Sequence, residues 1–197
     1  GEDVLAMPLR RWRRIAGREI GMVFQDALAA LNPVFSVGWQ VAERLRLNGT
    51  GRRAAWVEAA RLLVQVGIPD AAHRLNDYPH QFSGGMRQRI VIAIALATRP
   101  ALMICDEPTT ALDVTIQAQI LDLLARLRDE TGTAMIMVTH DLAVAAETAD
   151  RIVVMYGGRI VEAGTRSEVL GAPRHPYTAA LIAAAPRVDH HGAPLDA

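Results

Sequence analysis

Short apolar runs and amphipathic segments alternate along this chain. A strand-length apolar run at 20–25 is followed by two helical patterns, 37–47 and 52–66, each of which ends at a glycine. An apolar helix at 86–98 then leads into a continuous apolar run at 101–106, typical of a parallel strand that is buried on both faces. Because helices and buried strands alternate, the pattern predicts an α/β fold.

The second half of the chain continues this alternation. Asp113 can cap a helix whose apolar residues keep one face, and Gly132 stands where this helix should end. Residues 134–139 are predicted to form a second buried strand. Residues 151–163 should form a hairpin, because Gly157-Gly158 suits a two-residue turn that needs positive φ angles.

Two connecting segments complete this picture. An arginine-rich segment, 10–18, predicts a basic amphipathic surface helix, and residues 26–33 predict a polar loop. Residues 166–197 are rich in proline and alanine and form an extension beyond the last predicted strand.

Composition and charge exclude several classes of protein. The 197 residues are 51% hydrophobic with zero net charge, so nothing suggests electrostatic binding to nucleic acid. No apolar stretch approaches the roughly 20 residues of a transmembrane helix, so a transporter built from this chain needs separate membrane-spanning subunits. The single cysteine, Cys105, lies in an apolar run and is expected to be a buried, unreactive thiol.

Two adjacent carboxylates, Asp106 and Glu107, stand where the strand at 101–106 ends. In phosphoryl-transfer sites the first of two such acids binds Mg²⁺, directly or through water, and the second polarises or deprotonates the attacking water. Adjacent acids at a strand end can equally cap a helix, and in isolation this pair favours that interpretation. The motif that precedes them reverses the preference.

Ser83-Gly84-Gly85 leads directly into the helix predicted at 86–98. Two glycines allow close approach of a ligand to the backbone, and a helix N-terminus offers unpaired N–H groups to an anion. Alone, Ser-Gly-Gly is a common turn. Its position before the two acids indicates a phosphate-binding role.

The order and spacing of these motifs resemble the second half of an ATP-binding cassette (ABC) ATPase. The matching residues, in chain order, are Gln25, the signature motif from Phe82 to Arg89, Asp106-Glu107, Asp113 and His140. The resemblance implies the fold of an ABC nucleotide-binding domain, related to P-loop NTPases, with an inserted helical subdomain. It also implies ATP and Mg²⁺ as ligands.

The resemblance assigns a role to each matching residue. Glu107, His140 and Gln25 are the expected catalytic residues, and Asp106 and Gln25 are the expected ligands of the metal. The signature residues that are expected to bind the ATP of a partner subunit are Ser83, Gly84, Gly85 and Gln88. Asp113 is expected to cross the dimer interface, although helix capping explains this residue as well. For His140 the alternative is a structural role, which is usual for a lone histidine at a strand end.

One part of the family's site has no counterpart in this sequence. All 21 basic residues are arginine, so the lysine-containing phosphate loop G-x-x-x-x-G-K-[ST] of Walker A does not occur. The sequence also begins as though it were entered midway, which implies an incomplete parallel sheet. We expect this chain alone to bind ATP weakly and to hydrolyse none, while it still offers a complete signature to a partner's ATP.

Two further segments indicate a subgroup. Residues 23–26 with 31–33, and His175-Pro176-Tyr177 in the extension, resemble importers of oligopeptides, dipeptides and nickel. This implies a second ABC ATPase subunit, as a homodimer or heterodimer, and permease subunits at the cytoplasmic face of the membrane. We expect residues 26–47 to dock the permease, with Phe35 and Trp39 as the central aromatics.

Alternative functions remain open at this point. The chain could be a non-catalytic module that only donates its signature motif to a full-length partner. An ABC ATPase of DNA repair or translation is disfavoured, because the extension matches importers and no basic patch appears. The predicted parts are a remnant of the N-terminal core (1–36), the helical subdomain with the signature (37–92), the core with both acids and His140 (93–165), and the importer-type extension (166–197).

Overall fold

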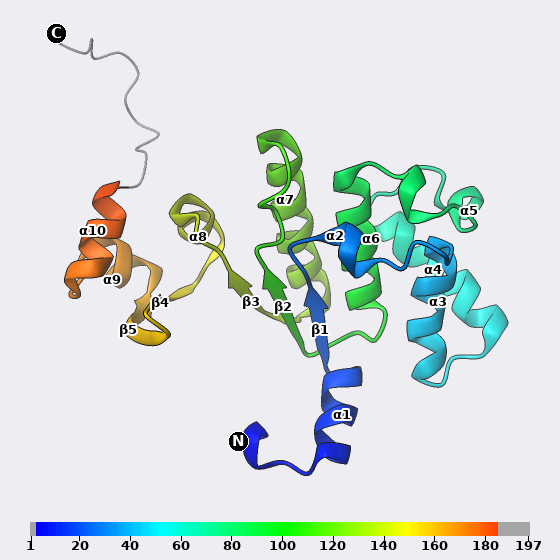
Figure 1. Cartoon of the computed structure of the whole chain (residues 1–197), viewed down its shortest axis with the longest axis horizontal. Coiled ribbons are helices and arrows are strands. Elements are labelled where there is room, and N and C mark those ends of the chain that lie inside the picture. The colour runs from blue at the N-terminus through cyan, green and yellow to red at the C-terminus, as the bar shows by residue number, and fades with distance from the viewer. Residues whose placement is uncertain (1–2, 185–197) are drawn as a thin grey trace, which may run out of the picture. The chain divides into compact units, whose positions relative to one another are not determined.

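The computed structural model describes residues 3–184 (Figure 1). These residues fall into two compact units, one that ends at Val138 and one that begins at Thr139. The last part of the predicted extension, residues 185–197, lies outside the described residues. In the part of the chain that the structure describes, no helix is both long enough and apolar enough to cross a bilayer.

The first unit is built on a three-stranded parallel sheet, which confirms the predicted α/β fold. Its strands are β1 (Ile20–Val23), β2 (Leu102–Asp106) and β3 (Ala134–Val138), in the spatial order β1-β2-β3. The register aligns Val23 with Cys105 and Cys105 with Met137. The carboxyl ends of all three strands therefore meet at one edge of the sheet.

Two long helices cover one face of this sheet, α6 (Gly84–Leu96) and α7 (Val114–Thr131). In α7 the carboxylate of Asp113 caps the first turn and Gly132 ends the helix at a φ of 66°, as predicted. The side chains buried on α7 are Ile120, Leu121, Leu123, Leu124 and Leu127. They share one face because their spacing follows the helical period.

A group of helices lies between β1 and α6 in the chain. It consists of α3 (Val37–Leu47), α4 (Arg52–Gln65), the short α5 (Ala71–Arg74) and the 3-10 turn η2 (Pro79–Gln81). Gly49 and Gly67, which follow α3 and α4, adopt φ angles of 97° and 79°, so the chain turns where the sequence predicted. Gly38 is required for packing, because a Cβ there would lie 2.6 Å from the Leu75 carbonyl oxygen.

Three sequence-based predictions for the first unit were wrong. The segment predicted as a polar loop contains a short helix, α2 (Ala27–Ala30), because the Asp26 carboxylate accepts hydrogen bonds from Leu28 and Ala29. The strand predicted to be buried at 134–139 is partly exposed, since Ile136 and Val138 face outward. The strand predicted at 101–106 to be buried on both faces is fully buried on one face only, at Met103 and Cys105.

At the N-terminus, the 3-10 turn η1 (Val4–Ala6) and α1 (Leu9–Arg18) contain no buried residue. The arginine-rich segment is therefore the surface helix that the sequence predicted. It leads into β1 through Glu19, whose carbonyl accepts a hydrogen bond from the Leu102 N–H at the start of β2.

The second unit contains the predicted hairpin. Its elements are α8 (Leu142–Thr148), β4 (Arg151–Tyr156), β5 (Arg159–Thr165), α9 (Arg166–Gly171) and α10 (Pro176–Ala184). Gly157 and Gly158 have φ angles of 56° and 75°, which confirms a turn with two positive φ angles. The Glu162 carboxylate accepts the N–H groups of Arg174 and His175, so β5 anchors the segment that leads into α10.

Candidate functional site

The two predicted acids lie at the carboxyl edge of the sheet. Asp106 is the last residue of the central strand β2, and Gln25 follows the neighbouring strand β1 by two residues. Val23 pairs with Cys105, so Gln25 and Asp106 leave adjacent strands at the same edge. In open parallel α/β sheets this edge is where ligands bind.

Glu107 is held in an unusual backbone conformation. Its φ is +45°, in the left-handed region, which costs a non-glycine residue of the order of 1–3 kcal/mol. Its N–H donates to the Val138 carbonyl at 2.9 Å, so β3 fixes the turn. The Thr110 hydroxyl donates to the Glu107 carboxylate at 3.0 Å, a contact that the sequence did not reveal. The neighbouring strand and Thr110 thus fix the position of this carboxylate.

The Ser-Gly-Gly motif forms the start of α6. The Ser83 hydroxyl accepts the N–H of Met86 at 3.4 Å and caps the helix. Phe82 is buried beneath the Arg74 guanidinium, 4.0 Å from the centre of the ring, and so anchors the loop. Ser83 and Gly84 are exposed, which leaves this helix N-terminus open to an anion.

Gly85 is required by packing between two helices. A Cβ at Gly85 would lie 2.5 Å from a methyl group of Ile116 on α7. Ile116 also donates its N–H to the Asp113 carboxylate at 3.0 Å. The signature and Asp113 therefore stand at two neighbouring helix N-termini. The capping role of Asp113 is observed, and its role across a dimer interface stays a prediction.

Gln88 is buried, and its side-chain amide donates to the Phe24 carbonyl at 3.2 Å. This bond joins α6 to the residue that immediately precedes Gln25. The geometry therefore gives Gln88 a positioning contact that the sequence did not indicate. That Gln88 itself binds a nucleotide stays a prediction.

Gln25 itself is exposed. A second buried glutamine, Gln40, orders the segment that follows it. The Gln40 amide group accepts the Asn32 N–H and donates to the carbonyls of Asn32 and Phe35, all at 2.9 Å. Sequence reasoning missed Gln40, because a polar residue inside an amphipathic helix gives no sign of its distant partners.

His140 is exposed and follows the last residue of β3 by two positions. It lies in the second compact unit, which begins at Thr139. There the Thr139 hydroxyl accepts the Asp141 N–H at 3.0 Å, and Asp141 caps α8. The catalytic role of His140 stays a prediction.

Asp106 fits a magnesium site in which phosphate oxygens and water supply most of the ligands. Among residues 3–184 no group of three or more His, Cys, Asp or Glu side chains could hold a metal ion. Mg²⁺ in nucleotide sites is usually bound by one or two carboxylates together with phosphate oxygens and water. Asp106, half-buried at the end of β2, fits such a site.

Cys105 precedes these acids but takes no part in their chemistry. It is fully buried, and burial raises the pKa of its thiol to about 12, because the apolar surroundings disfavour the thiolate. This confirms that the thiol is buried, as predicted.

Two family models match this chain, one over its first part and one near its C-terminus. The model of the family described as "ABC transporter" matches residues 1–110. The model described as "Oligopeptide/dipeptide transporter, C-terminal region" matches residues 161–196.

Similar sequences include several import proteins. A putative peptide import ATP-binding protein of Brucella melitensis is 56% identical over 187 residues, which cover 94% of this chain and 55% of that protein. The dipeptide transport ATP-binding protein DppD of Bacillus subtilis is 50% identical over 195 residues, 98% of this chain and 58% of that protein. The chain thus spans little more than half the length of these relatives.

Solved structures with this fold are ATP-binding cassettes and transporter components. The dimeric cassette MJ0796 bound to ADP and Pi has a TM-score of 0.70 and 29% identity, over 82% of this chain and 68% of that one. The cbiO1 protein of Clostridium perfringens, part of the cbiONQ transporter complex, has a TM-score of 0.72 and 28% identity, over 84% of this chain and 64% of that one.

Proposed function

Because this chain belongs to the ABC transporter family, we propose that it is part of the ATP-hydrolysing subunit of an importer. The observation that carries the proposal is the fixed turn at Glu107. A strained backbone at the carboxyl end of a central parallel strand, with the carboxylate held by Thr110, is typical of a site that positions a reacting group. The neighbouring Asp106 supports the same function.

The residues divide the chemistry between them. Asp106, with Gln25 just after the adjacent strand, would hold Mg²⁺, which neutralises charge on the transferring phosphoryl group. Glu107 would accept a proton from the attacking water or orient that water, and His140 would contact the γ-phosphate. Gln88 supports this arrangement by fixing the backbone beside Gln25.

The exposed N-terminus of α6 serves a second nucleotide. Ser83, Gly84 and Gly85 present backbone N–H groups and the positive end of the helix dipole, which suit phosphate oxygens. We propose that they bind the ATP held by a second ABC subunit in a dimer. In this arrangement the chain contributes to two sites through two separate sets of residues.

The first experiment measures ATP turnover. In the protein that carries this chain, Glu107→Gln should lower turnover by about 10²–10⁴-fold and leave ATP binding intact, because this carboxylate acts on the water. Glu130→Gln, an exposed acid on α7, is the matched control and should keep full activity. Unchanged turnover in Glu107→Gln would assign the general base to another residue.

The 197-residue chain itself provides the second experiment. It has no lysine, so we expect it to show no measurable turnover alone. Mixed with a full-length ABC subunit whose own signature serine is replaced, it should restore activity in a manner that depends on Ser83. Restoration without any turnover by the protein that carries this chain would favour the signature-donating module over the enzyme.

The names of the relatives support one class of imported solute. Their names describe import of peptides, transport of dipeptides and, for GsiA of Escherichia coli, import of glutathione. The C-terminal match is to oligopeptide and dipeptide transporters. We therefore propose short peptides as the solute, with nickel as the less supported alternative.

The same proposal places the subunit at the cytoplasmic face of the membrane, where residues 26–47 dock a permease subunit. Leu28, Val34 and Phe35 expose apolar side chains there, and Phe35 stacks on Trp39 with ring centroids 4.0 Å apart. Phe35→Ala should abolish co-purification with the permease and preserve the fold. Trp12→Ala, an exposed aromatic on α1, is the control that should assemble normally.

A further inference from the structure

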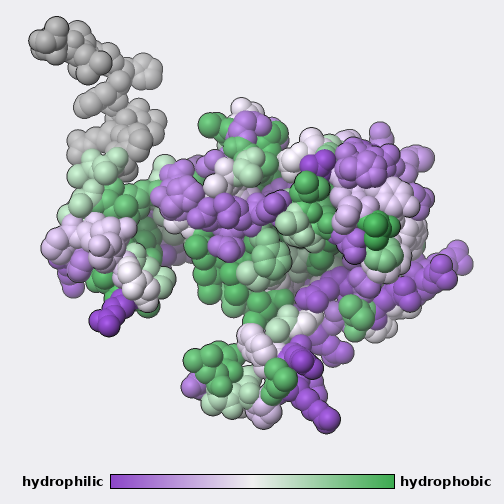
Figure 2. All heavy atoms as spheres, viewed as in Figure 1, coloured by the Kyte–Doolittle hydropathy of each residue, from purple (hydrophilic) through white to green (hydrophobic). Residues whose placement is uncertain are grey.

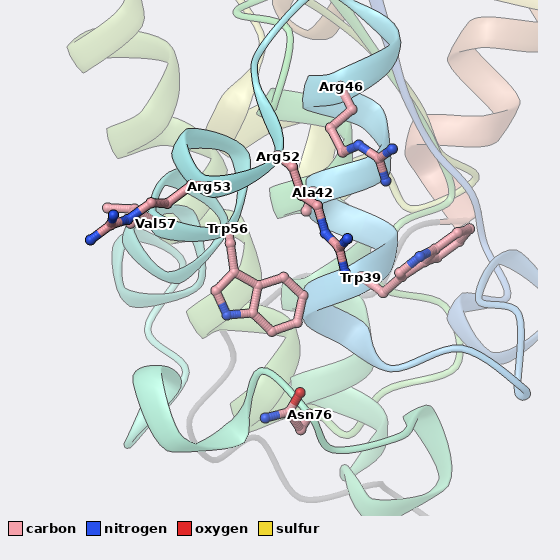
Figure 3. Close-up of a pocket in the computed structure, with 8 residues that line it drawn as sticks. All are labelled: Trp39, Ala42, Arg46, Arg52, Arg53, Trp56, Val57 and Asn76. Atoms are coloured by element: carbon pink, nitrogen blue, oxygen red, sulfur yellow. The ribbon is translucent and has the colours of Figure 1, made fainter.

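A cavity of about 940 Å³ opens between α3 and α4, on the helical part of the first unit. Figure 3 shows it with the residues that line it: Trp39, Ala42, Arg46, Arg52, Arg53, Trp56, Val57 and Asn76. It is formed by side chains one helical turn apart on α3 and by the first two turns of α4. None of these residues belongs to the nucleotide site described above. The volume is at the upper end of the range found for small-molecule sites, about 300–1,000 Å³.

The apolar part of the lining is aromatic. Trp39 and Trp56 are both half-buried and come from the two facing helices. Trp39 is stacked on Phe35 at an interplanar angle of 15°, which holds its indole in one orientation. The fixed indole of Trp39 and the half-buried indole of Trp56 suit a flat, ring-bearing ligand, because aromatic rings stack favourably on one another.

The polar part of the lining is cationic. Arg46, Arg52 and Arg53 carry three positive charges, and no acidic side chain lines the cavity. Within the described residues none of these three guanidinium groups takes part in an ion pair. Their charges are therefore available to a ligand, and guanidinium groups bind carboxylate and phosphate with two parallel hydrogen bonds.

Two of these arginines, Arg52 and Arg53, occupy an electrostatically unfavourable position at the start of a helix. Arg52 and Arg53 are the first residues of α4, where the helix dipole favours acidic residues, and the preceding Gly51 provides no side-chain cap. The cationic first turn disfavours the free helix, and an anion in the cavity would relieve this. Figure 3 shows Arg52 reaching from α4 toward α3, whereas Arg53 points away on the other side of Trp56.

We propose that this cavity binds a small organic anion that carries an aromatic ring. The ring would lie against Trp39 and Trp56, and the anionic group would pair with Arg46 and Arg52. Trp39 also belongs to the proposed permease-docking segment, so a bound ligand would alter docking. This regulatory consequence rests on the proposed function, whereas ligand binding does not.

The test uses 1-naphthyl phosphate as the probe and uncharged 1-naphthol as its control. Binding to the chain is followed by quenching of tryptophan fluorescence in a Trp12→Phe background, so that the signal comes from Trp39 and Trp56. We expect the phosphate to bind at least about tenfold more tightly than the naphthol, and less tightly as salt is added. Equal binding of the two probes would overturn the proposal.

Paired variants test the location of the site. Arg46→Gln with Arg52→Gln should weaken binding of the phosphate by about tenfold or more and leave binding of the naphthol unchanged. Arg44→Gln with Arg61→Gln removes the same charge from the same two helices outside the cavity and should change binding by less than about twofold. An equal loss of phosphate binding in both double variants would mean that the probe responds only to the net charge of the protein. This result would reject the site.

Discussion

The two faces of the parallel sheet differ sharply, although both are apolar. On the face covered by α6 and α7, Val23, Met103 and Cys105 are completely buried. On the opposite face, Met22, Ile136 and Val138 are 42%, 50% and 47% exposed. Figure 2 shows hydrophobic residues gathered over β1, β2 and β3 on this uncovered face.

The difference shows what apolar strand patterns do and do not specify. Parallel strands are normally covered on both faces, and their residues are therefore apolar throughout. The side chains of the uncovered face are apolar, like those of a core, but they are exposed and not packed. The covered face alone should therefore contribute most of the stability of the sheet, and four sets of variants test this contrast.

The largest effect is expected from a matched pair of methionines. Met103→Ala on the covered face should lower the free energy of unfolding by about 2–5 kcal/mol, because it leaves a cavity under α6 and α7. Met22→Ala on the uncovered face should cost less than about 1 kcal/mol. Urea unfolding measures both, and equal losses would mean that the two faces are packed alike.

A glycine on the covered face gives the next effect. Gly21→Ala places a Cβ 2.8 Å from the Ala95 carbonyl oxygen of α6, and this backbone contact should cost about 1–3 kcal/mol. Gly17→Ala in α1, where a Cβ meets nothing within 4 Å, should instead stabilise by about 0.5–1 kcal/mol. Thermal or urea unfolding measures both variants, and an unchanged free energy of unfolding in Gly21→Ala would contradict the prediction.

Glu107 follows β2 at the carboxyl edge of the sheet and has a strained backbone. Glu107→Gly and Glu107→Ala both remove the contact with Thr110, and only glycine relaxes a φ of +45°. The glycine variant should therefore be more stable than the alanine variant by about 1 kcal/mol. Both should lose ATP turnover in the protein that carries this chain. Equal stabilities would indicate that the backbone shifts to remove the strain.

The smallest change in stability is expected on the uncovered face itself. Ile136→Thr with Val138→Thr should reduce binding of a hydrophobic dye to the chain, with a change in unfolding free energy within about 1 kcal/mol. Val114→Thr alters a single, strongly exposed valine on α7 and should leave dye binding unchanged. Undiminished dye binding in the double variant would show that the dye binds elsewhere.

Much of the candidate site was predictable because its signals are local. Ser83 caps α6 through Met86, and Asp113 caps α7 through Ile116, each within three residues. The glycine turn of the hairpin is equally local, since it depends on the φ angles of two adjacent residues. Such features follow from residue type and spacing alone.

Other features of the site depend on contacts between distant segments. The bond from Gln88 to Phe24 joins positions 64 residues apart, and nothing near Gln88 in the sequence indicates it. The strain at Glu107 is equally hidden, because the Val138 carbonyl that fixes this turn belongs to a different strand. Which side chains surround these groups is decided only when the strands pair.

The sequence by itself therefore determined the α/β class, most helix ends, the order of the motifs and the family, because each depends on neighbouring residues or on motif order. Only the tertiary structure decided which sheet face is covered by α6 and α7, what holds Glu107 in place and which residues line the cavity between α3 and α4. These depend on packing between segments far apart in the chain. An apolar residue has the same hydrophobicity whether or not another element covers it, so the sequence pattern does not distinguish the two cases.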